Sequence, residues 1–293
     1  MKTSNAARLR SLLARKEMLV APGAYDCITA RMIEQAGFSA VYMTGAGTAA
    51  TLGYPDYGLT TMTEMADNAG RIATATRLPV IADADTGFGN ELNMVRTVRE
   101  YERRGVAGLH VEDQTFPKKC GHLESKTVIG KDEYLSKIAA AASARTDPDF
   151  LIIARTDSRS VLGLDEAIDR ANRALDAGAD MAFVEAAQNL DEVAAIPRRV
   201  HGPCLLNLVW RGKTPDVSFS DAQAMGYRIA ILPGMLFKAV MATCDRVLEE
   251  TRRLGRHGSP GSEMTPKENF NRLGALEWDA ISERAHQAAA LVK

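Results

Sequence analysis

The feature that most constrains this chain is an alternation of short apolar runs and amphipathic helical patterns, repeated eight times. The apolar runs lie at residues 18–22, 40–44, 79–83, 108–112, 151–155, 181–185, 204–207 and 229–233. The helical patterns follow them, at residues 28–36, 61–76, 91–104, 131–145, 164–177, 190–200, 220–225 and 235–254. Strands that are apolar along their whole length are typical of a parallel sheet buried on both faces.

This alternation predicts an α/β fold, and specifically a (β/α)₈ TIM barrel. An open doubly wound sheet would also alternate. Eight even units, and a first strand not followed by Gly-x-Gly-x-x-Gly, favour a closed barrel. Residues 6–15 have an amphipathic pattern, which predicts an N-terminal helix that covers one end of the barrel. We therefore predict a catalytic barrel domain over residues 1–255.

The final segment departs from the repeat. Residues 256–262 read Arg-His-Gly-Ser-Pro-Gly-Ser, which is typical of a hinge, and a helical pattern then runs from about Pro266 to Val292. A helix beyond the eighth unit cannot join a closed barrel, so its apolar side chains must cover an outer surface of its own subunit or of a neighbour. These side chains are Phe270, Leu273, Leu276, Trp278 and Ile281. We predict that residues 256–293 are a hinge and a helical tail for oligomerisation.

Charge and cysteine usage limit the partners and the compartment. The chain has 36 Lys and Arg against 37 Asp and Glu, so no long-range field attracts nucleic acid or an anionic membrane. The cysteines (Cys27, Cys120, Cys204 and Cys244) are widely spaced, as expected of free thiols in a reducing compartment. No run reaches the ~18 apolar residues of a membrane span, and residues 1–5 lack an apolar signal core. We expect a cytoplasmic protein that binds neither nucleic acid nor membrane.

Polar residues stand where the predicted strands end, which is where the ligands of such barrels gather. They are Asp26, Tyr42, Thr44, Asp83, Asp85, Glu112, Asp113, Arg155, Asp157, Glu185 and Asn207. Asp83 and Asp85 alternate along the chain and therefore point to one side. With Glu112 they would repel one another unless a cation were present, and oxygen ligands suit Mg²⁺ or Mn²⁺. An Asp-x-Asp pair alone is a common turn, but this combination predicts a metal site.

Two further features near the strand ends suit a carboxylate ligand. The planar guanidinium of Arg155 can pair with both oxygens of a carboxylate, although a structural ion pair with Asp157 or Glu185 is the alternative. The glycine turn at residues 45–47 would leave backbone N–H groups free for a second carboxylate, which taken alone is a weak signal.

The segment at residues 110–122 begins as a strand and ends in a loop that reads Lys118-Lys119-Cys120-Gly121-His122. Nearby cations favour a thiolate, and glycine lets the loop move or approach a ligand closely. A lone cysteine is usually a small buried apolar residue, but these polar neighbours indicate a functional thiol. His122 would either position Cys120 or transfer a proton itself. His110 lies within the strand and is expected to be a core residue.

Together these motifs resemble those of the isocitrate lyase/phosphoenolpyruvate mutase superfamily, most closely its branch of 2-methylisocitrate and 2,3-dimethylmalate lyases. The similarity runs over about residues 19–254 and includes the segments at residues 22–26, 80–89, 110–114, 118–122 and 153–157. The Lys-Lys-Cys-Gly-His segment is similar to the signature of the carbon–carbon lyases in that superfamily.

The resemblance implies roles for particular residues. Mg²⁺ would be held by Asp83, Asp85 and Glu112, with Asp56 also near it. The substrate would be surrounded by Tyr42, Thr44, Gly45, Ala46, Gly121, Arg155, Glu185 and Asn207. Cys120 would act as the acid/base on a mobile loop, with Lys118 and His122 beside it. The resemblance also implies a homotetramer in which the C-terminal helix swaps onto a neighbouring subunit.

One segment departs from the pattern of this branch. Its members usually continue the seventh strand as Asn-x-x-Glu-Gly-Gly-x-Thr-Pro, whereas residues 207–215 here read Asn-Leu-Val-Trp-Arg-Gly-Lys-Thr-Pro. Trp210 replaces a carboxylate near the substrate, and Arg211 adds a cation. This change should favour a more anionic or differently shaped substrate.

We therefore predict a Mg²⁺-dependent lyase that cleaves a 2-hydroxy di- or tricarboxylate, similar to 2-methylisocitrate, into a dicarboxylate and a 2-oxo acid, pyruvate or glyoxylate. Tyr42 or a carboxylate would remove the hydroxyl proton. Cys120 would protonate the departing enolate while the loop at residues 115–128 excludes water. The alternatives are an oxaloacetate hydrolase or decarboxylase, a phosphonate-type mutase, and a non-catalytic barrel that binds metal and dicarboxylate.

Overall fold

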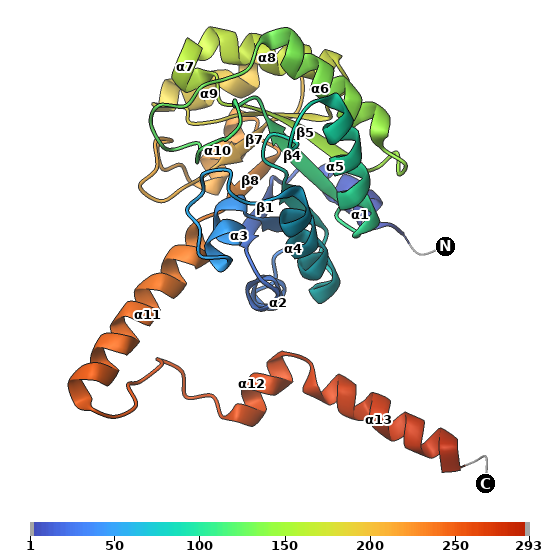
Figure 1. Cartoon of the computed structure of the whole chain (residues 1–293), viewed down its shortest axis with the longest axis vertical. Helices are drawn as coiled ribbons and strands as arrows, with labels where there is room; N and C mark the ends of the chain where they lie inside the picture. The colour runs from blue at the N-terminus through green and yellow to red at the C-terminus, as the bar shows by residue number, and fades with distance from the viewer. Residues whose placement is uncertain (1–2, 291–293) are drawn as a thin grey trace. The chain divides into compact units, whose positions relative to one another are not determined.

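The computed structural model describes residues 3–290, and its strands form a nearly closed parallel barrel (Figure 1). The strands are hydrogen-bonded in the order β6-β5-β4-β3-β2-β1-β8-β7. A single parallel bridge between Ala182 and Cys204 joins the two ends of this order. The predicted barrel is therefore confirmed. The strands are β1 (Leu19–Ala24), β2 (Val41–Met43), β3 (Val80–Asp83), β4 (Gly108–Glu112), β5 (Leu151–Thr156), β6 (Met181–Val184), β7 (Leu205–Asn207) and β8 (Ile229–Leu232).

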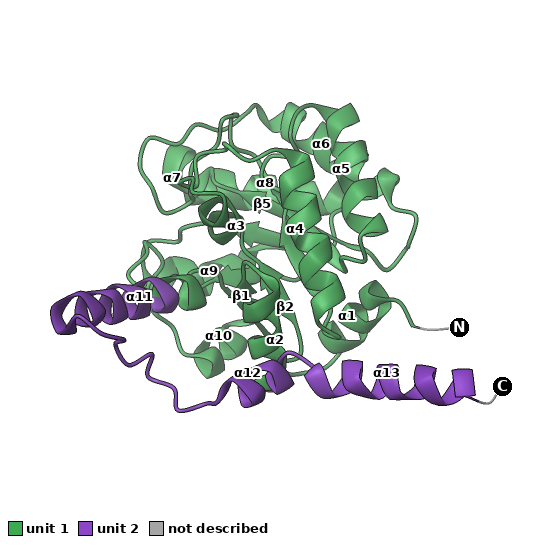
Figure 2. Ribbon diagram, turned by 60° about the horizontal axis from the view of Figure 1, so that its bottom comes forward, with its two compact units in different colours: residues 1–238 green, residues 239–293 purple. Residues whose placement is uncertain are grey.

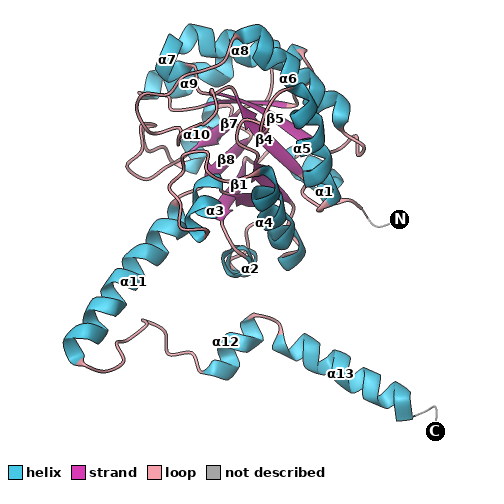
Figure 3. Ribbon diagram, in the orientation of Figure 1, coloured by secondary structure: helices cyan, strands magenta, loops and turns pink. Residues whose placement is uncertain are grey.

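Helices surround the barrel, and Figure 3 shows the strands inside their ring. Each helix predicted before residue 256 is present within one or two residues of its expected bounds, and the helical pattern predicted from about Pro266 is present as two helices; α3 and α7 were not predicted. The helices of the described residues are α1 (Asn5–Leu13), α2 (Cys27–Gln35), α3 (Gly45–Thr51), α4 (Met62–Ala75), α5 (Glu91–Arg103), α6 (Lys131–Ala144), α7 (Arg159–Leu162), α8 (Leu164–Asp176), α9 (Leu190–Arg199), α10 (Phe219–Met225), α11 (Met235–Leu254), α12 (Pro266–Arg272) and α13 (Ala275–Ala290).

Apolar side chains from alternate strand positions fill the interior of the barrel, among them Ile81, Ile153 and Phe183. The helix α1 covers the amino-terminal ends of the strands, because its Leu9 is fully buried in the same cluster. An ion pair between Arg10 and Asp180, with 2.8 Å between Nη2 and Oδ1, holds α1 there. The opposite end of the interior, where the strands finish, is left uncovered by α1.

The chain divides into two compact units, residues 1–238 and residues 239–293 (Figure 2). The first unit contains all the strands. The second contains the rest of α11 together with α12 and α13, which are separated at Gly274, where φ is +96°. Trp278 in α13 is 70% exposed. The helical tail was predicted to end at Val292, which lies outside the described residues.

No helix within residues 3–290 is both long enough and apolar enough to cross a membrane.

Candidate active site

The carboxyl ends of the strands carry a buried cluster of polar side chains. Strand register places Asp83 beside His110 and Glu112 beside Arg155, because β3, β4 and β5 are consecutive neighbours. The cluster comprises Tyr42 of β2, Asp83 of β3, His110 and Glu112 of β4, Arg155 of β5, Glu185 after β6 and Asn207 of β7, all of them buried. The predicted gathering of strand-end residues at one end of the barrel is thus present.

Tyr42 and His110 form the floor of this cluster. The Tyr42 hydroxyl lies 2.8 Å from His110 Nε2 and 3.4 Å from Asp83 Oδ2. Burial, and then Asp83, raise the pKa of Tyr42 well above its usual value, while burial lowers the pKa of His110 to about 4. Both rings are therefore neutral at neutral pH. His110 was expected to be a core residue. It is fully buried, but it also contacts the site. The sequence signal for this contact is that His110 and Glu112 are two positions apart on one strand and therefore point to the same side.

Acidic side chains and one lysine meet beside this floor. Asp83 accepts hydrogen bonds from the amides of Asp85, at 2.9 Å, and Gly45, at 3.2 Å. Lys118 Nζ lies 2.7 Å from Asp85 Oδ1 and 2.5 Å from Asp56 Oδ1. Burial raises the pKa of Asp85 to about 7; Asp83 and Asp56 add to this effect, and Lys118 opposes it. The site therefore contains more buried carboxylates than Lys118 alone neutralises.

Arg155 lies among carboxylates at the centre of the cluster. Its Nε is 3.1 Å from Glu112 Oε2 and 2.9 Å from Asp157 Oδ2, and its Nη2 is 3.3 Å from Glu185 Oε2. The structural ion pairs considered as an alternative are therefore present. Phe183 lies under the guanidinium, with 5.1 Å between Cζ and the ring centroid. These contacts fix the plane of Arg155, as recognition of a carboxylate requires.

The predicted metal ligands are shared with cations of the protein itself. Within residues 3–290, no group of three or more His, Cys, Asp or Glu side chains converges as a ready metal cage. Lys118 lies between Asp85 and Asp56, and Arg155 lies beside Glu112. The set nevertheless fits a hard divalent cation, because its ligands are buried carboxylates and Glu112 Oε1 accepts no hydrogen bond.

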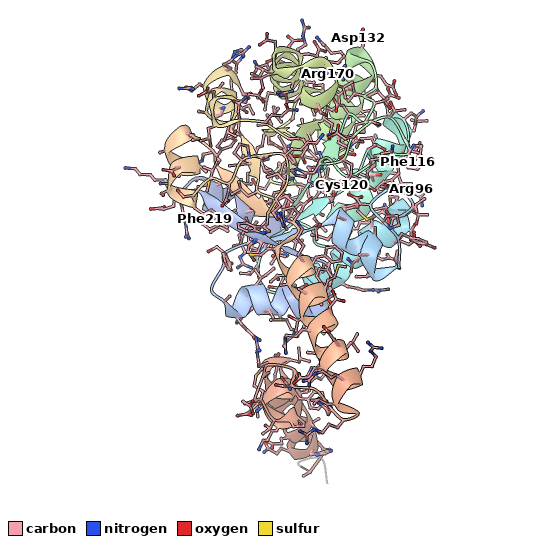
Figure 4. The ribbon with its side chains drawn as sticks, turned by 90° about the vertical axis from the view of Figure 1, so that its left-hand side faces the viewer. Arg96, Phe116, Cys120, Asp132, Arg170 and Phe219 are labelled. Carbon is pink, nitrogen blue, oxygen red and sulfur yellow. The ribbon has the colours of Figure 1, made fainter. Side chains whose placement is uncertain are left out.

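Residues 114–128 form the loop that carries Cys120 (labelled in Figure 4). An antiparallel bridge between Gln114 and Val128 closes the base of the loop. The Gln114 side chain also bonds the backbone of Lys119, accepting from its N–H at 3.0 Å and donating to its carbonyl at 2.8 Å. The Cys120 amide donates to the Asp56 carbonyl at 3.0 Å. The loop is thus a closed unit whose tip lies against the strand ends.

The protonation of Cys120 differs from the expectation. We expected neighbouring cations to favour the thiolate, but burial, and then Asp56, raise the pKa of the Cys120 thiol to about 11. The ammonium of Lys118 is directed to Asp56 and Asp85. That expectation is therefore wrong, and Cys120 is a neutral thiol at neutral pH.

Gly121 and His122 bring the loop into contact with the substrate-facing cluster. A Cβ at position 121 would lie 2.5 Å from Arg155 Nη2 and 2.6 Å from Glu185 Cγ, so only glycine permits this approach. His122 Nδ1 accepts from the Lys213 amide at 3.0 Å, and Nε2 lies 3.6 Å from Glu185 Oε1. Burial lowers the pKa of His122, so its ring is neutral.

The glycine turn predicted after Thr44 is the first turn of α3. The Gly45 amide donates to Asp83, and the Gly47 amide donates to Thr44 Oγ1 at 3.4 Å. Two of the amides that were expected to be free for a carboxylate are therefore engaged within the protein. Ala46 lies between them in the same turn.

Trp210 and Arg211 lie outside the buried cluster. Trp210 is 69% exposed and lines a cavity of about 570 Å³ with Phe219 and Met235. Arg211 is exposed and has a φ of +58°. Their link to the site is Gly212, which packs against the His122 ring so closely that a Cβ there would lie 2.8 Å from Nδ1.

Comparisons with known proteins extend over the whole barrel. Residues 9–252 match the family model described as phosphoenolpyruvate phosphomutase. The 2,3-dimethylmalate lyase of Eubacterium barkeri is 48% identical over 244 residues, which are 83% of this chain and 84% of that protein. The 2-methylisocitrate lyase of Aeropyrum pernix is 43% identical over 247 residues, which are 84% and 80% of the two chains. A solved structure of oxaloacetate acetylhydrolase with the inhibitor 3,3-difluorooxalacetate has a TM-score of 0.93 and 39% identity, covering 97% of this chain and 98% of that one.

Proposed function

Because this chain belongs to the phosphoenolpyruvate mutase/isocitrate lyase superfamily, we propose that it is a carbon–carbon lyase acting on a 2-hydroxy di- or tricarboxylate. The products would be a 2-oxo acid, pyruvate or glyoxylate, and a second carboxylate. The observation that carries this proposal is the seating of the Cys120 loop. Gly121 lies against Arg155 and Glu185, and this contact brings a protonated thiol to a cluster of buried carboxylates.

Mg²⁺, with Mn²⁺ as a substitute, would be held by Asp83, Asp85 and Glu112, with Asp56 near it. When bound, the cation would act as a Lewis acid that lowers the pKa of the substrate hydroxyl. The buried Oε1 of Glu112, which accepts no hydrogen bond, supports this assignment. Arg155, with its guanidinium plane fixed by its neighbours, would bind a substrate carboxylate. The remaining residues proposed to line the substrate are Thr44, Gly45, Ala46, Gly121, Glu185, Asn207 and Arg211.

The proposed reaction needs two proton transfers, and different side chains of the site carry them out. Tyr42 was considered as the base that removes the substrate hydroxyl proton. A neutral phenol hydrogen-bonded to His110 is a proton donor, so we assign removal of that proton to a carboxylate. The departing half is an enolate of a carboxylate and needs a proton at once. Cys120 carries that proton at neutral pH, and the closed loop keeps water away from the enolate. Lys118 and His122 hold the loop in place through Asp56 and Glu185.

A second candidate within the same superfamily is hydrolysis of oxaloacetate to acetate and oxalate. The TM-score of 0.93 with oxaloacetate acetylhydrolase favours this candidate, although that protein is 39% identical, less than the lyases of Eubacterium barkeri and Aeropyrum pernix. The products separate the two activities, because the hydrolase releases no 2-oxo acid.

The test is a substrate screen with the purified full-length chain. 2-Methylisocitrate, isocitrate and 2,3-dimethylmalate are each supplied with Mg²⁺, and 2-oxo-acid release is followed. Oxaloacetate, which is itself a 2-oxo acid, is supplied in the same way, and its individual products are identified. We expect release from one of the hydroxy acids, its loss with EDTA, and its recovery when Mg²⁺ is added in excess. Acetate and oxalate from oxaloacetate would identify the hydrolase instead. Binding of all four compounds without turnover would replace the proposal with a non-catalytic barrel.

We also propose an assembly and a compartment. The exposed apolar side chains of α12 and α13 support a homotetramer in which this tail covers a neighbouring subunit. The cysteines are free thiols in the structure, which agrees with a cytoplasmic location.

A further inference from the structure

Lys126 is a buried cation within the Cys120 loop that the proposed reaction does not use. Its side chain is 1% exposed. The ammonium donates to the backbone carbonyl of Gly121 and, at 2.6 Å, to Asp157 Oδ1. Gly121 is the neighbour of Cys120, and Asp157 follows β5. Lys126 therefore joins the tip of the loop to the end of a barrel strand.

Asp157 links this lysine to the substrate-facing cluster. Its Oδ2 accepts from Arg155 Nε at 2.9 Å, and its amide donates to Asp113 Oδ1 at 2.7 Å. Asp113 Oδ2 accepts from Arg170 Nη1 at 3.0 Å, and Arg170 (labelled in Figure 4) donates to the Ile129 carbonyl at 2.9 Å. One buried network therefore contacts the tip of the loop, the segment after its base, and Arg155.

A second lysine contacts the same loop from its exposed side and provides a contrast. Lys213 Nζ lies 2.7 Å from Glu124 Oε1, but the Glu124 side chain is 84% exposed. Exposed ion pairs contribute little to stability, because water and salt screen them. Removing one partner of a buried pair is costly, because the other charge is left without compensation. Of these two contacts, the one made by Lys126 should control whether the loop is closed.

We propose that Lys126 is a positioning residue that fastens the Cys120 loop in its closed arrangement and couples that closure to Arg155 through Asp157. This inference rests on the proposed function, in which loop closure brings the Cys120 proton to the reacting atoms. The lysine itself touches no reacting group. When the loop opens at its tip, the bond to Gly121 breaks and water reaches the ion pair with Asp157.

The test compares Lys126→Met with Lys213→Met, which removes the cation that pairs with the exposed Glu124 of the same loop. The first measurement is the rate at which iodoacetamide alkylates Cys120 in the free full-length protein. Peptide mass spectrometry separates Cys120 from Cys27, Cys204 and Cys244. We expect alkylation about tenfold faster, or more, in Lys126→Met, because the loop opens more often. Lys213→Met should stay within about twofold of the parent protein.

The second measurement is turnover with the substrate found in the screen. Lys126→Met should lower kcat by about 10- to 100-fold with little change in KM, since loop closure, more than substrate binding, is impaired. Lys126→Arg retains a cation and should recover part of the loss. Thermal unfolding shows whether each variant folds. If Lys126→Met does not, Lys126→Gln, which retains a hydrogen-bond donor, replaces it under the same criteria.

Unchanged alkylation of Cys120 in Lys126→Met would overturn the inference, as would equal effects of the two lysine variants. This result is separable from failure of the proposed function, because alkylation needs neither substrate nor turnover. Faster alkylation in a protein that converts none of the compounds would support the fastening role and count against the lyase.

Discussion

Burial, more than the neighbouring lysines, sets the protonation of Cys120. An acid that must protonate a strongly basic enolate should hold its proton until the enolate forms, and a thiol with a pKa of about 11 does so at neutral pH. The lysine beside it, Lys118, neutralises Asp56 and Asp85 and leaves the thiol uncharged. The sequence shows the lysine but not the direction of its side chain, and that direction reversed the expected effect.

Replacing Cys120 with alanine removes the proposed proton donor. We expect kcat to fall by about 10²- to 10⁴-fold, which is the usual contribution of a positioned acid, while the fold persists. Cys244→Ala is the matched control, because Cys244 is an exposed thiol in α11. Turnover is measured by 2-oxo-acid release. Undiminished turnover in the Cys120 variant, or in Cys120→Ser, would remove Cys120 from the mechanism.

The pH dependence of Cys120 alkylation follows from its raised pKa. Only the thiolate reacts, so the rate should rise about tenfold for each pH unit between pH 7 and pH 10, below the pKa of about 11. Iodoacetamide incorporation into the Cys120 peptide measures it. A rate that levels off near pH 8 would mean that the thiol has an ordinary or lowered pKa.

At the scale of elements, the strands and most helices could be predicted because each carries its own periodic signal. The short helix α3 could not, because Gly45 and Gly47 favour turns when read alone. The packed barrel overrides that preference: Thr44 caps the helix, and a Cβ on Gly47 would lie 2.6 Å from Tyr25 Cβ. Glycine there serves close packing.

The residues of the candidate site also fall into those that could be predicted from the sequence and those that could not. Residues at strand ends, such as Asp83 and Glu112, could be placed together because parallel strands finish at one end of a barrel. Lys126 could not, because its partners are a backbone carbonyl within the loop and a carboxylate 31 positions along the chain. No periodic pattern reports contacts of that kind.

Gly121→Ala tests whether the loop must lie against the strands. The added methyl would meet Arg155 and Glu185, so the loop tip should be displaced and kcat should fall by about 10- to 100-fold. Gly130→Ala is the matched control, because a Cβ there meets nothing within 4 Å. Thermal unfolding should be nearly unchanged in both variants, since the loop contributes little to the barrel core. Equal activity of the two variants would contradict the seating of the loop.

At the scale of the whole molecule, the second unit lacks a core of its own: none of the residues in α11, α12 or α13 is buried. Exposed apolar side chains such as Leu276 and Trp278, gathered on one segment, are typical of an interaction surface. We therefore expect that removing residues 258–293 reduces the assembly to a smaller species in light scattering. Leu276→Asp with Trp278→Asp should do the same by point substitution. An unchanged particle mass in both proteins would exclude a role for the tail in assembly.

The barrel is closed at β6 and β7 by the single bridge between Ala182 and Cys204, whereas the other neighbouring strands share at least two register pairs. A closed sheet should open first between the two strands that share the fewest hydrogen-bonded pairs. Amide deuterium uptake should accordingly start at residues 182 and 204, ahead of β4 and β5. Cys204 lies at that seam and is 1% exposed, so the rate at which a thiol reagent labels it would report how often the cylinder opens there.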